Sequence, residues 1–194
     1  MANQYFENNE NLQSEIKKIS YFYKGVEINF FADNGVFSKS GIDFGSNLLL
    51  KTVDLRNTKT VLDVGCGSGI LSIAAMLLGA KSAVGVDIDA LAVKTAIANA
   101  EVNGVSDKFT GICGNLAEKV SGKFDVVVAN IVADIVILLT QDAPRFMNPD
   151  TIYIMSGIID TREDDVLACL AEKFELIDRR EEKGWVALAA KLKA

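Results

Sequence analysis

A glycine-rich stretch in the middle of the chain constrains the fold more than any other feature. Val61–Gly69 reads VLDVGCGSG and lies between an apolar strand and a helical segment. Its glycines, Gly65, Gly67 and Gly69, stand at alternate positions, which is more glycine than a tight strand-to-helix turn needs. Without Cβ atoms the backbone can approach a ligand closely, and the amide N–H groups of the turn can face a polar or anionic group. The G-x-G-x-G spacing differs from the G-x-G-x-x-G of dinucleotide-binding proteins.

Short apolar runs alternate with helical segments from residue 58 to the end of the chain. The strands are expected at Thr60–Val64, Ala83–Val86, Phe109–Cys113, Asp125–Ala129, Thr151–Ser156, Phe174–Arg180 and Trp185–Ala190. The helices are expected at Ile70–Leu78, from Asp89 to Asn103, after Ala129 to about Asp142, and from about Thr161 to Lys173. This alternation predicts an α/β fold with a seven-stranded, mostly parallel sheet, helices on both faces and an antiparallel strand from the C-terminal hairpin.

The first 57 residues follow a different pattern. The predicted elements are strands at Tyr21–Tyr23 and Val26–Phe31 around a Lys24-Gly25 turn, a polar loop over Asp33–Asp43 and a helix around Phe44–Leu55. Such a segment is too short for a separate core. We therefore expect residues 1–57 to form an extension packed on a main domain of residues 58–194.

The amino-acid composition excludes several kinds of catalytic site. The 194 residues include no histidine, which excludes a Ser-His-Asp or Cys-His nucleophile, a histidine general base and a histidine-containing zinc site. Cys66, Cys113 and Cys169 form no C-x-x-C pair, which argues against a disulfide framework or a thiolate metal cluster and favours a reducing cytoplasm. We expect no metal. Any chemistry must use carboxylates, amides, backbone groups or a reactive cofactor.

The charge and hydropathy of the chain limit the kinds of partner that it can bind. The formal net charge is −6 and the sequence pI about 4.8, with no cluster of Lys and Arg of the kind that binds a long nucleic-acid backbone. Residues 1–20 contain no apolar core typical of a secretory signal. The longest apolar stretch, Val126–Leu139, is interrupted by Asn130 and Asp134 and is too short to span a bilayer. The sequence predicts a soluble cytoplasmic protein.

Polar side chains follow the second and third predicted strands of the main domain. Asp87 lies 18 residues after Gly69, at the end of the second strand, where a carboxylate suits hydrogen bonding to the hydroxyls of a ribose. Ile88 could lie against the face of a base, and Asp89 is expected to cap the next helix. Asn115 follows the third strand. Its amide could read the edge of an adenine, and an ordinary Asx turn explains it equally well.

Asn130 follows the fourth strand, at the edge of the sheet where open α/β folds bind ligands. Its amide carbonyl could accept a hydrogen bond from an amine and direct the lone pair of the nitrogen. The alternative is that Asn130 only caps a helix that begins at Ile131. The position at the end of a strand favours the functional interpretation.

These motifs resemble the class I S-adenosylmethionine-dependent methyltransferases, from about residue 33 to the C-terminus. The resemblance is carried by Asp63 and the three glycines, by the acid after the second strand and by the asparagine after the fourth. The stretch GCGSGILSIAAMLLGAK, together with ANIVADIV at Ala129–Val136, is most similar to the PrmA-type ribosomal-protein methyltransferases. The segments SGII at Ser156–Ile159 and KGWVAL at Lys183–Leu188 are also similar to that family.

The resemblance implies a Rossmann-like fold, S-adenosylmethionine as the cofactor and N-methylation of a protein such as a ribosomal protein. The cofactor contacts that we predict are Asp63, Gly65, Cys66, Gly67, Gly69, Asp87, Ile88, Asn115, Leu116 and Asn130, with Asn130 at the methyl-transfer end. Because this cofactor brings an activated methyl group, the protein mainly has to align an acceptor with it. A chain without histidine can therefore still be an enzyme.

Two features depart from the PrmA-type pattern. At 194 residues the chain is expected to lack a separate N-terminal recognition domain, and Asp43–Ser46 (DFGS) replaces the His and paired Thr of the loop before the glycines. The segment DNGVFSKSGIDFGSNLLL at Asp33–Leu50 instead resembles the RsmC-type enzymes, which methylate a guanine amino group of small-subunit rRNA. The N-P-P-aromatic motif of nucleobase enzymes is absent, because Ile131 and Val132 follow Asn130.

Three functions remain open on the sequence. A protein amine methyltransferase is favoured by the ANIVAD motif and the acidic pI. An rRNA guanine methyltransferase is supported by the RsmC-like loop, and a non-catalytic S-adenosylmethionine-binding module by the expected lack of a recognition domain. In either enzyme we expect the substrate side of the pocket to be lined by Phe37, Ser38, Gly45 and Ser46, with ordinary loop packing as the alternative.

Overall fold

The structure is a computed structural model that describes residues 17–32, 44–52 and 59–194. Its strands are β1 Lys17–Tyr23, β2 Val26–Ala32, β3 Thr60–Val64, β4 Ser82–Asp87, β5 Phe109–Cys113, β6 Phe124–Asn130, β7 Met147–Ile159, β8 Phe174–Glu182 and β9 Trp185–Leu192. Its helices are α1 Phe44–Thr52, α2 Ile70–Leu77, α3 Ala90–Val102, α4 Ala133–Asp142 and α5 Glu163–Leu170, with short 3₁₀ turns at Ser106–Lys108, Ala143–Phe146 and Asp160–Arg162.

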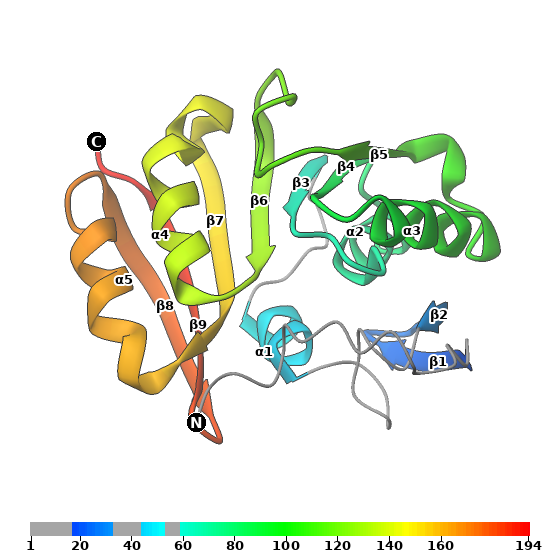
Figure 1. Ribbon diagram of the computed structural model, residues 1–194, viewed down its shortest axis with the longest axis horizontal. Helices are drawn as coiled ribbons and strands as arrows, with labels where there is room; N and C mark the ends of the chain where they lie inside the picture. The colour runs from blue at the N-terminus through cyan, green and yellow to red at the C-terminus, as the bar shows by residue number, and fades with distance from the viewer. Residues whose placement is uncertain (1–16, 33–43, 53–58) are drawn as a thin grey trace.

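In the described residues, seven strands form one sheet in the order β5-β4-β3-β6-β7-β9-β8 (Figure 1). The neighbours from β5 to β7 are parallel, whereas β9 runs antiparallel to both β7 and β8. The predicted α/β fold is confirmed, including the antiparallel strand of the C-terminal hairpin. Strand β7 begins at Met147 instead of the predicted Thr151. It includes the polar residues Asn148-Pro149-Asp150, whose sequence is typical of a loop. Helix α5 is shorter than predicted because a 3₁₀ turn precedes it.

The strands bury alternate side chains on opposite faces of the sheet. On β6, Val127 and Ala129 join a core with residues of α4 and α5, whereas Val126 and Val128 join a second core with residues of α1, α2 and α3. Figure 1 shows α4 and α5 side by side on the first of these faces. Because helices cover both faces, the central strands read as nearly continuous apolar runs.

Two hairpins turn at Lys-Gly pairs. Lys24 and Gly25 have φ of 46° and 88°, and Lys183 and Gly184 have φ of 55° and 79°. Two successive left-handed residues are typical of type I′ turns, which match the right-handed twist of the flanking strands. Both hairpins predicted from the sequence are therefore confirmed. The β1–β2 hairpin packs against α2 and α3, with Phe30 fully buried in the second core (Figure 1).

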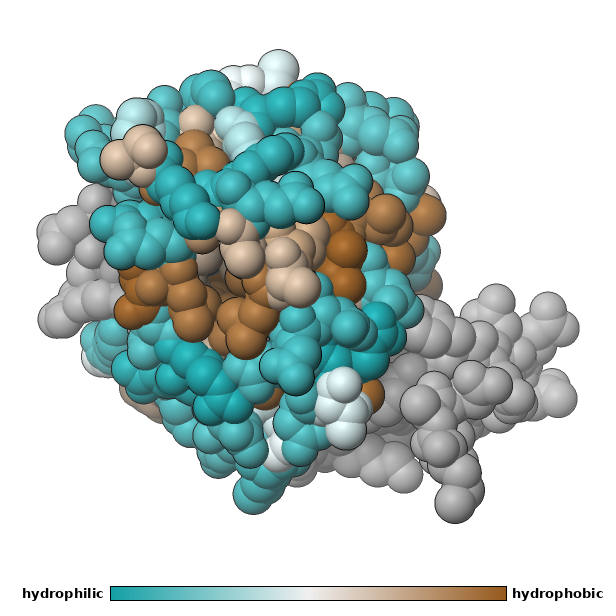
Figure 2. Space-filling model, turned by 90° about the vertical axis from the view of Figure 1, so that its left-hand side faces the viewer, coloured by the Kyte–Doolittle hydropathy of each residue, from teal (hydrophilic) through white to brown (hydrophobic). Residues whose placement is uncertain are grey.

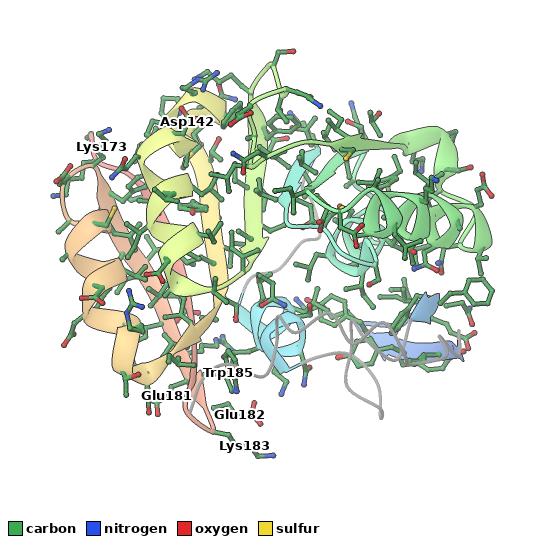
Figure 3. All side chains as sticks on the ribbon, in the orientation of Figure 1. Asp142, Lys173, Glu181, Glu182, Lys183 and Trp185 are labelled. Atoms are coloured by element: carbon green, nitrogen blue, oxygen red, sulfur yellow. The ribbon has the colours of Figure 1, made fainter. Side chains whose placement is uncertain are left out.

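Helix α1 is held between the N-terminal hairpin and the C-terminal hairpin. The Tyr23 hydroxyl of β1 donates to the backbone oxygen of Leu50, and Lys51 Nζ lies 3.3 Å from Glu182 Oε2 of β8. Figure 3 shows Glu182 at the tip of the β8–β9 hairpin, with Trp185 on the side of α1. In Figure 1, α1 lies at the end of the sheet to which β6 points.

Strand β8 forms one edge of the sheet. Figure 2 shows this side of the molecule, on which apolar patches are surrounded by hydrophilic side chains. Leu176 and Ile177 are 42% and 44% exposed, and the charged residues Glu175, Arg179 and Arg180 flank them on the same strand. Charges on an edge strand disfavour pairing with another chain. Among the described residues, the helices fall short of the length and apolar character that a membrane crossing requires.

Candidate functional site

The glycine-rich turn, Asp87 and Asn130 meet at the carboxyl ends of three adjacent strands. The turn follows β3, Asp87 ends β4 and Asn130 ends β6, and β3 lies between the other two strands. The chain continues from β3 to β4 and β5 on one side, and then crosses to β6 on the other. Open α/β sheets bind ligands in the crevice at such a switch point. Three motifs that are separated in the sequence therefore form one candidate site.

The glycine-rich turn is held against β4 by its own backbone. Gly65, Gly67 and Gly69 have φ of +74°, +52° and +78°, in the left-handed region that favours glycine. Gly65 N and Cys66 N donate to Val86 O at 2.8 and 2.9 Å. Gly69 N donates to Cys66 O at 2.7 Å. These three amides therefore complete the turn and tie it to the neighbouring strand.

Asp87 fixes the remaining glycine of the turn. Its Oδ2 accepts from Gly67 N at 2.9 Å, and its Oδ1 accepts from Asp89 N at 3.0 Å. A carboxylate offers about four acceptor positions, so each oxygen keeps capacity for one further donor such as a ribose hydroxyl. Asp89 Oδ1 in turn accepts from Leu91 N at 2.8 Å, which confirms Asp89 as the N-cap of α3.

Asp63 is buried at the end of β3, behind the turn. Its Oδ2 accepts from Ser72 Oγ at 2.8 Å and from Ser72 N at 3.3 Å. Within the described residues, its Oδ1 has no hydrogen-bond partner, and neither has the buried Ser68 Oγ of the turn. Buried polar atoms normally have partners. Two such atoms at the turn fit a site that receives a polar group of a cofactor.

The surroundings of Asp63 favour its neutral form. Burial raises the pKa of the carboxyl group to about 7, although the two hydrogen bonds from Ser72 oppose the shift. The negative charge of Asp87 raises the pKa of Asp63 further. A positively charged group bound beside Asp63 would stabilise the ionised carboxylate instead.

The raised pKa predicts how stability changes with pH. An aspartate has a pKa of about 3.9 in the unfolded chain. Because the pKa of Asp63 is about 7 in the folded protein, the folded state binds more protons and becomes less stable as the pH rises from about 4 to about 7. Asp63→Asn has the same shape and does not titrate. We expect the free energy of unfolding of the wild type, relative to Asp63→Asn, to fall by on the order of 4 kcal/mol over this range.

Urea unfolding of both proteins at a series of pH values measures this difference. Groups common to the two proteins cancel in the comparison. The difference should become constant only well above pH 7, where Asp63 is ionised in both states. A difference that does not change between pH 4 and 7 would contradict the raised pKa.

Asn130 is the last residue of β6 and is half-buried. Its Nδ2 donates to Ser46 Oγ of α1 at 3.0 Å, and Ser46 is only 2% exposed. Helix α4 begins at Ala133 with Val132 as its N-cap residue. The alternative in which Asn130 caps a helix starting at Ile131 is therefore wrong. The side chain is oriented by a helix that precedes it by many residues in the chain.

Three glycines allow close packing around Asn130 and the next residue, Ile131. A Cβ on Gly45 would lie 2.3 Å from Asn130 Oδ1, so a larger residue in α1 would displace the amide. A Cβ on Gly65 would lie 2.3 Å from Ile131 Cγ2. A Cβ on Gly157, which has φ of +78° at a bulge in β7, would lie 2.6 Å from Ile131 O. Close packing on three sides thus holds the end of β6 in place.

The other predicted cofactor residues lie at the outer part of the same edge. Ile88 is 73% exposed directly after Asp87. Asn115 is exposed, and its Nδ2 donates to Glu118 Oε1 at 3.0 Å, which leaves both of its interpretations open. Leu116 follows with φ of 46°. These residues lie beyond β4 and β5, on the side of the turn away from Asn130.

Cys66 is buried in the turn, and burial raises the pKa of its thiol well above the usual range. A thiol that stays protonated fills space and is not a nucleophile. Phe37 and Ser38 lie outside the described residues, as does the expected boundary between residues 57 and 58. The structure therefore brings Gly45 and Ser46 of the predicted substrate side to Asn130, and describes no contact for the other two.

Two asparagines of α3 that the motifs did not indicate also reach this region. Asn99 is fully buried, and Asn103 is the C-cap residue of the helix. The signal in the sequence is weak: two asparagines four residues apart, in a helix whose neighbouring positions are apolar. Both side chains bond to the N-terminal hairpin, and Asn99 also bonds to the glycine-rich turn.

Comparisons of the sequence with known proteins show which proteins this chain is similar to. Residues 46–193 match the family model described as ribosomal protein L11 methyltransferase (PrmA). The ribosomal protein L11 methyltransferase of Pelotomaculum thermopropionicum is 44% identical over 165 residues, which cover 84% of this chain and 54% of that protein. That of Clostridium botulinum strain Alaska E43 is 40% identical over 176 residues, covering 89% and 56%. The chain thus spans about half the length of the curated relatives it matches.

Solved structures agree with this assignment. The ribosomal protein L11 methylase of Lactobacillus delbrueckii subsp. bulgaricus has a TM-score of 0.68 at 38% identity, with 70% of each chain covered. The T. thermophilus 16S rRNA N2 G1207 methyltransferase RsmC, in complex with AdoMet and guanosine, has a TM-score of 0.75 at 22% identity, with 92% of this chain and 51% of that chain covered. The second likeness concerns the fold alone. The first, together with the family match, confirms the resemblance found in the sequence: the chain belongs to the ribosomal protein L11 methyltransferase (PrmA) family.

Proposed function

We propose that the protein transfers a methyl group from S-adenosylmethionine to an amino group of a protein, in particular a ribosomal protein. The observation that carries this proposal is the position of Asn130. It lies at the carboxyl end of β6, beside a glycine-rich turn that is flanked by two carboxylates, in a chain of the PrmA family. The relatives' names supply the substrate class.

The cofactor would be held by residues on both sides of the turn. We assign Asp87 to the ribose hydroxyls, Ile88, Asn115 and Leu116 to the adenine, and Asp63 to the amino-acid part. Gly65, Cys66, Gly67 and Gly69 would make the close backbone contacts. When bound, S-adenosylmethionine supplies a methyl group activated by a sulfonium. Asp63 Oδ1, which has no partner in the part of the chain that the structure describes, and the spare acceptor positions of Asp87 support this assignment.

Asn130 would act on the acceptor amine. A lysine-like amine has a pKa of about 10.4, so removing its proton at pH 7 costs about 4.6 kcal/mol. Apolar surroundings lower the pKa of the amine. The Asn130 carbonyl would accept a hydrogen bond from the neutral amine and direct its lone pair, while the bond to Ser46 and the contact with Gly45 keep the amide in one orientation. This alignment needs no histidine.

The charge of the chain supports a protein acceptor. A net charge of −6 is complementary to a basic ribosomal protein and disfavours binding to an RNA backbone. The free cysteines Cys66, Cys113 and Cys169 fit a reducing cytoplasm, where such a substrate is found. We also propose that residues 1–57 act as an extension of the domain formed by residues 58–194. The packing of the β1–β2 hairpin on α2 and α3 supports this division.

Methyl-labelled S-adenosylmethionine and intact ribosomes test the proposal. After incubation with the full chain, the ribosomes are separated into protein and rRNA, and free ribosomal proteins are assayed in parallel. We expect label in the protein fractions and none above background with the Asn130→Ala variant. Label in rRNA would support the RsmC-type function instead. Binding of S-adenosylmethionine with label in neither fraction would favour a non-catalytic module.

A further inference from the structure

The two asparagines of α3 cover the open edge of β2. Phe31 N donates to Asn99 Oδ1 at 2.7 Å, and Asn99 Nδ2 donates back to Phe31 O at 3.1 Å. Asn29 N donates to Asn103 Oδ1 at 2.9 Å, and Asn103 Nδ2 donates to Asn29 O. Alternate residues of a strand direct their backbone groups to the same edge, and β1 pairs with the other edge. Two side-chain amides, one helical turn apart, therefore make the backbone hydrogen bonds that a third strand would make.

Asn99 makes one further bond that Asn103 does not share. Asn99 Nδ2 also donates to the backbone oxygen of Ser68, in the glycine-rich turn, at 2.9 Å. The second donor of Asn103 instead reaches the backbone oxygen of Asn99 at 2.7 Å. The two residues thus have the same chemistry and the same partner strand, but only Asn99 connects that strand to the turn.

Helix α3 also packs directly on the turn beside this bond. A Cβ on Gly69 would lie 2.9 Å from the Cβ of Ala96, which is on the same face of α3 as Asn99. The three left-handed glycines of the turn have little conformational preference of their own. Two hydrogen bonds select one orientation of the peptide between Ser68 and Gly69: Gly69 N donates to Cys66 O within the turn, and Asn99 Nδ2 donates to Ser68 O from outside it.

We infer that Asn99 is a positioning residue for the cofactor: it joins the N-terminal hairpin to the glycine-rich turn and fixes the carbonyl of Ser68. This inference rests on the proposed binding of S-adenosylmethionine. Removing the side chain leaves Ser68 O as a buried acceptor without this donor, beside Ser68 Oγ, for which residues 17–32, 44–52 and 59–194 supply no partner. The turn then has to be ordered by the cofactor itself, which weakens binding. Conversely, bound cofactor stabilises the turn and, through Asn99, the edge of β2.

The test compares Asn99→Ala with the matched control Asn103→Ala. Both variants lose the bonds to β2, so both should lower the thermal stability of the protein, Asn99→Ala more than Asn103→Ala because Asn99 is fully buried. Calorimetry with S-adenosylmethionine should give a Kd about tenfold higher for Asn99→Ala, the effect of one buried hydrogen bond. The Kd of Asn103→Ala should stay within about twofold of the wild type. Asn99→Ser keeps one hydrogen-bond donor, and its Kd is expected to lie between those of the two alanine variants. It replaces Asn99→Ala in the test if that variant does not fold.

Hydrogen exchange of the Phe31 amide supplies a second readout that a merely structural role would not change. S-adenosylmethionine should slow this exchange in the wild type and in Asn103→Ala, and should not slow it in Asn99→Ala. Equal values of Kd for the two alanine variants would overturn the inference. A wild-type protein that does not bind S-adenosylmethionine would instead overturn the proposed function, and this inference with it.

Discussion

Asn130→Ala is expected to slow methyl transfer at least about 100-fold while the Kd for S-adenosylmethionine stays within about threefold. The side chain lies at the end of β6, where we place the acceptor amine, and the carboxylates assigned to the cofactor lie on β3 and β4. Loss of one group that aligns or stabilises the reacting centre costs about 10²–10³ in rate. Because we assign Asn130 to the acceptor amine, its loss should change cofactor binding little. Single-turnover rates with labelled cofactor and calorimetric Kd values measure the two effects separately.

Ser46→Ala is the graded control for this prediction. It removes the hydroxyl that accepts from Asn130 Nδ2 at 3.0 Å and leaves the amide in place. We expect a rate loss of about tenfold, between the wild type and Asn130→Ala, because one orienting hydrogen bond is lost. An unchanged rate for Asn130→Ala would show that the asparagine only packs against α1. If the Kd of Asn130→Ala for S-adenosylmethionine rises as much as the rate falls, Asn130 binds the cofactor and does not align the acceptor.

Asp87→Ala is expected to weaken binding of S-adenosylmethionine at least about 100-fold. The carboxylate would accept two hydrogen bonds from the ribose, and bonds to a charged group contribute about 1.5–3 kcal/mol each. The substitution also removes the acceptor of Gly67 N, which lies 2.9 Å from Asp87 Oδ2, and so loosens the turn. Two such bonds correspond to a factor of 100 or more in Kd, since about 1.4 kcal/mol is tenfold. Calorimetry measures the effect.

Asp89→Ala is the matched control, two residues along the same edge. Its carboxylate caps α3 through Leu91 N, so the variant should lose about 1 kcal/mol of stability. The Kd for the cofactor should stay within about threefold of the wild type. If Asp89→Ala weakens binding as much as Asp87→Ala does, the effect comes from the start of α3 and the ribose assignment of Asp87 fails.

Much of the fold could be predicted from local patterns. Helix α3 begins after Asp89 and ends at Asn103, as its capping residues indicated, and both Lys-Gly turns close hairpins. These features depend on residues a few positions apart, so a short stretch of sequence contains the necessary information. The bounds of β7 could not be predicted in the same way. Its first residue, Met147, pairs with Phe124 of β6, and its bulge at Gly157 fits the backbone of Ile131; both partners are distant in sequence.

The candidate site was only partly predictable for a similar reason. The sequence predicts Asp87 and Asn130 at strand ends, and in the structure these two ends lie on either side of β3. The orientation of the amides in the turn could not be inferred, because Gly65 N and Cys66 N are directed to Val86 O of another strand. Asn99 gave no functional signal, because a buried asparagine in a helix is recognised only through its partners.

By itself, the sequence determined the alternation of strands and helices, the glycine-rich turn between a strand and a helix, and the presence of an acid and an amide at two strand ends. Near neighbours decide such features. Only the tertiary structure decided that Asn130 is oriented by Ser46, 84 residues earlier, and that Asn99 joins Phe31, 68 residues earlier, to the turn. The physical reason is that a buried amide is stable only where it finds hydrogen-bond partners, and these partners are brought together by the packing of the whole sheet and its helices.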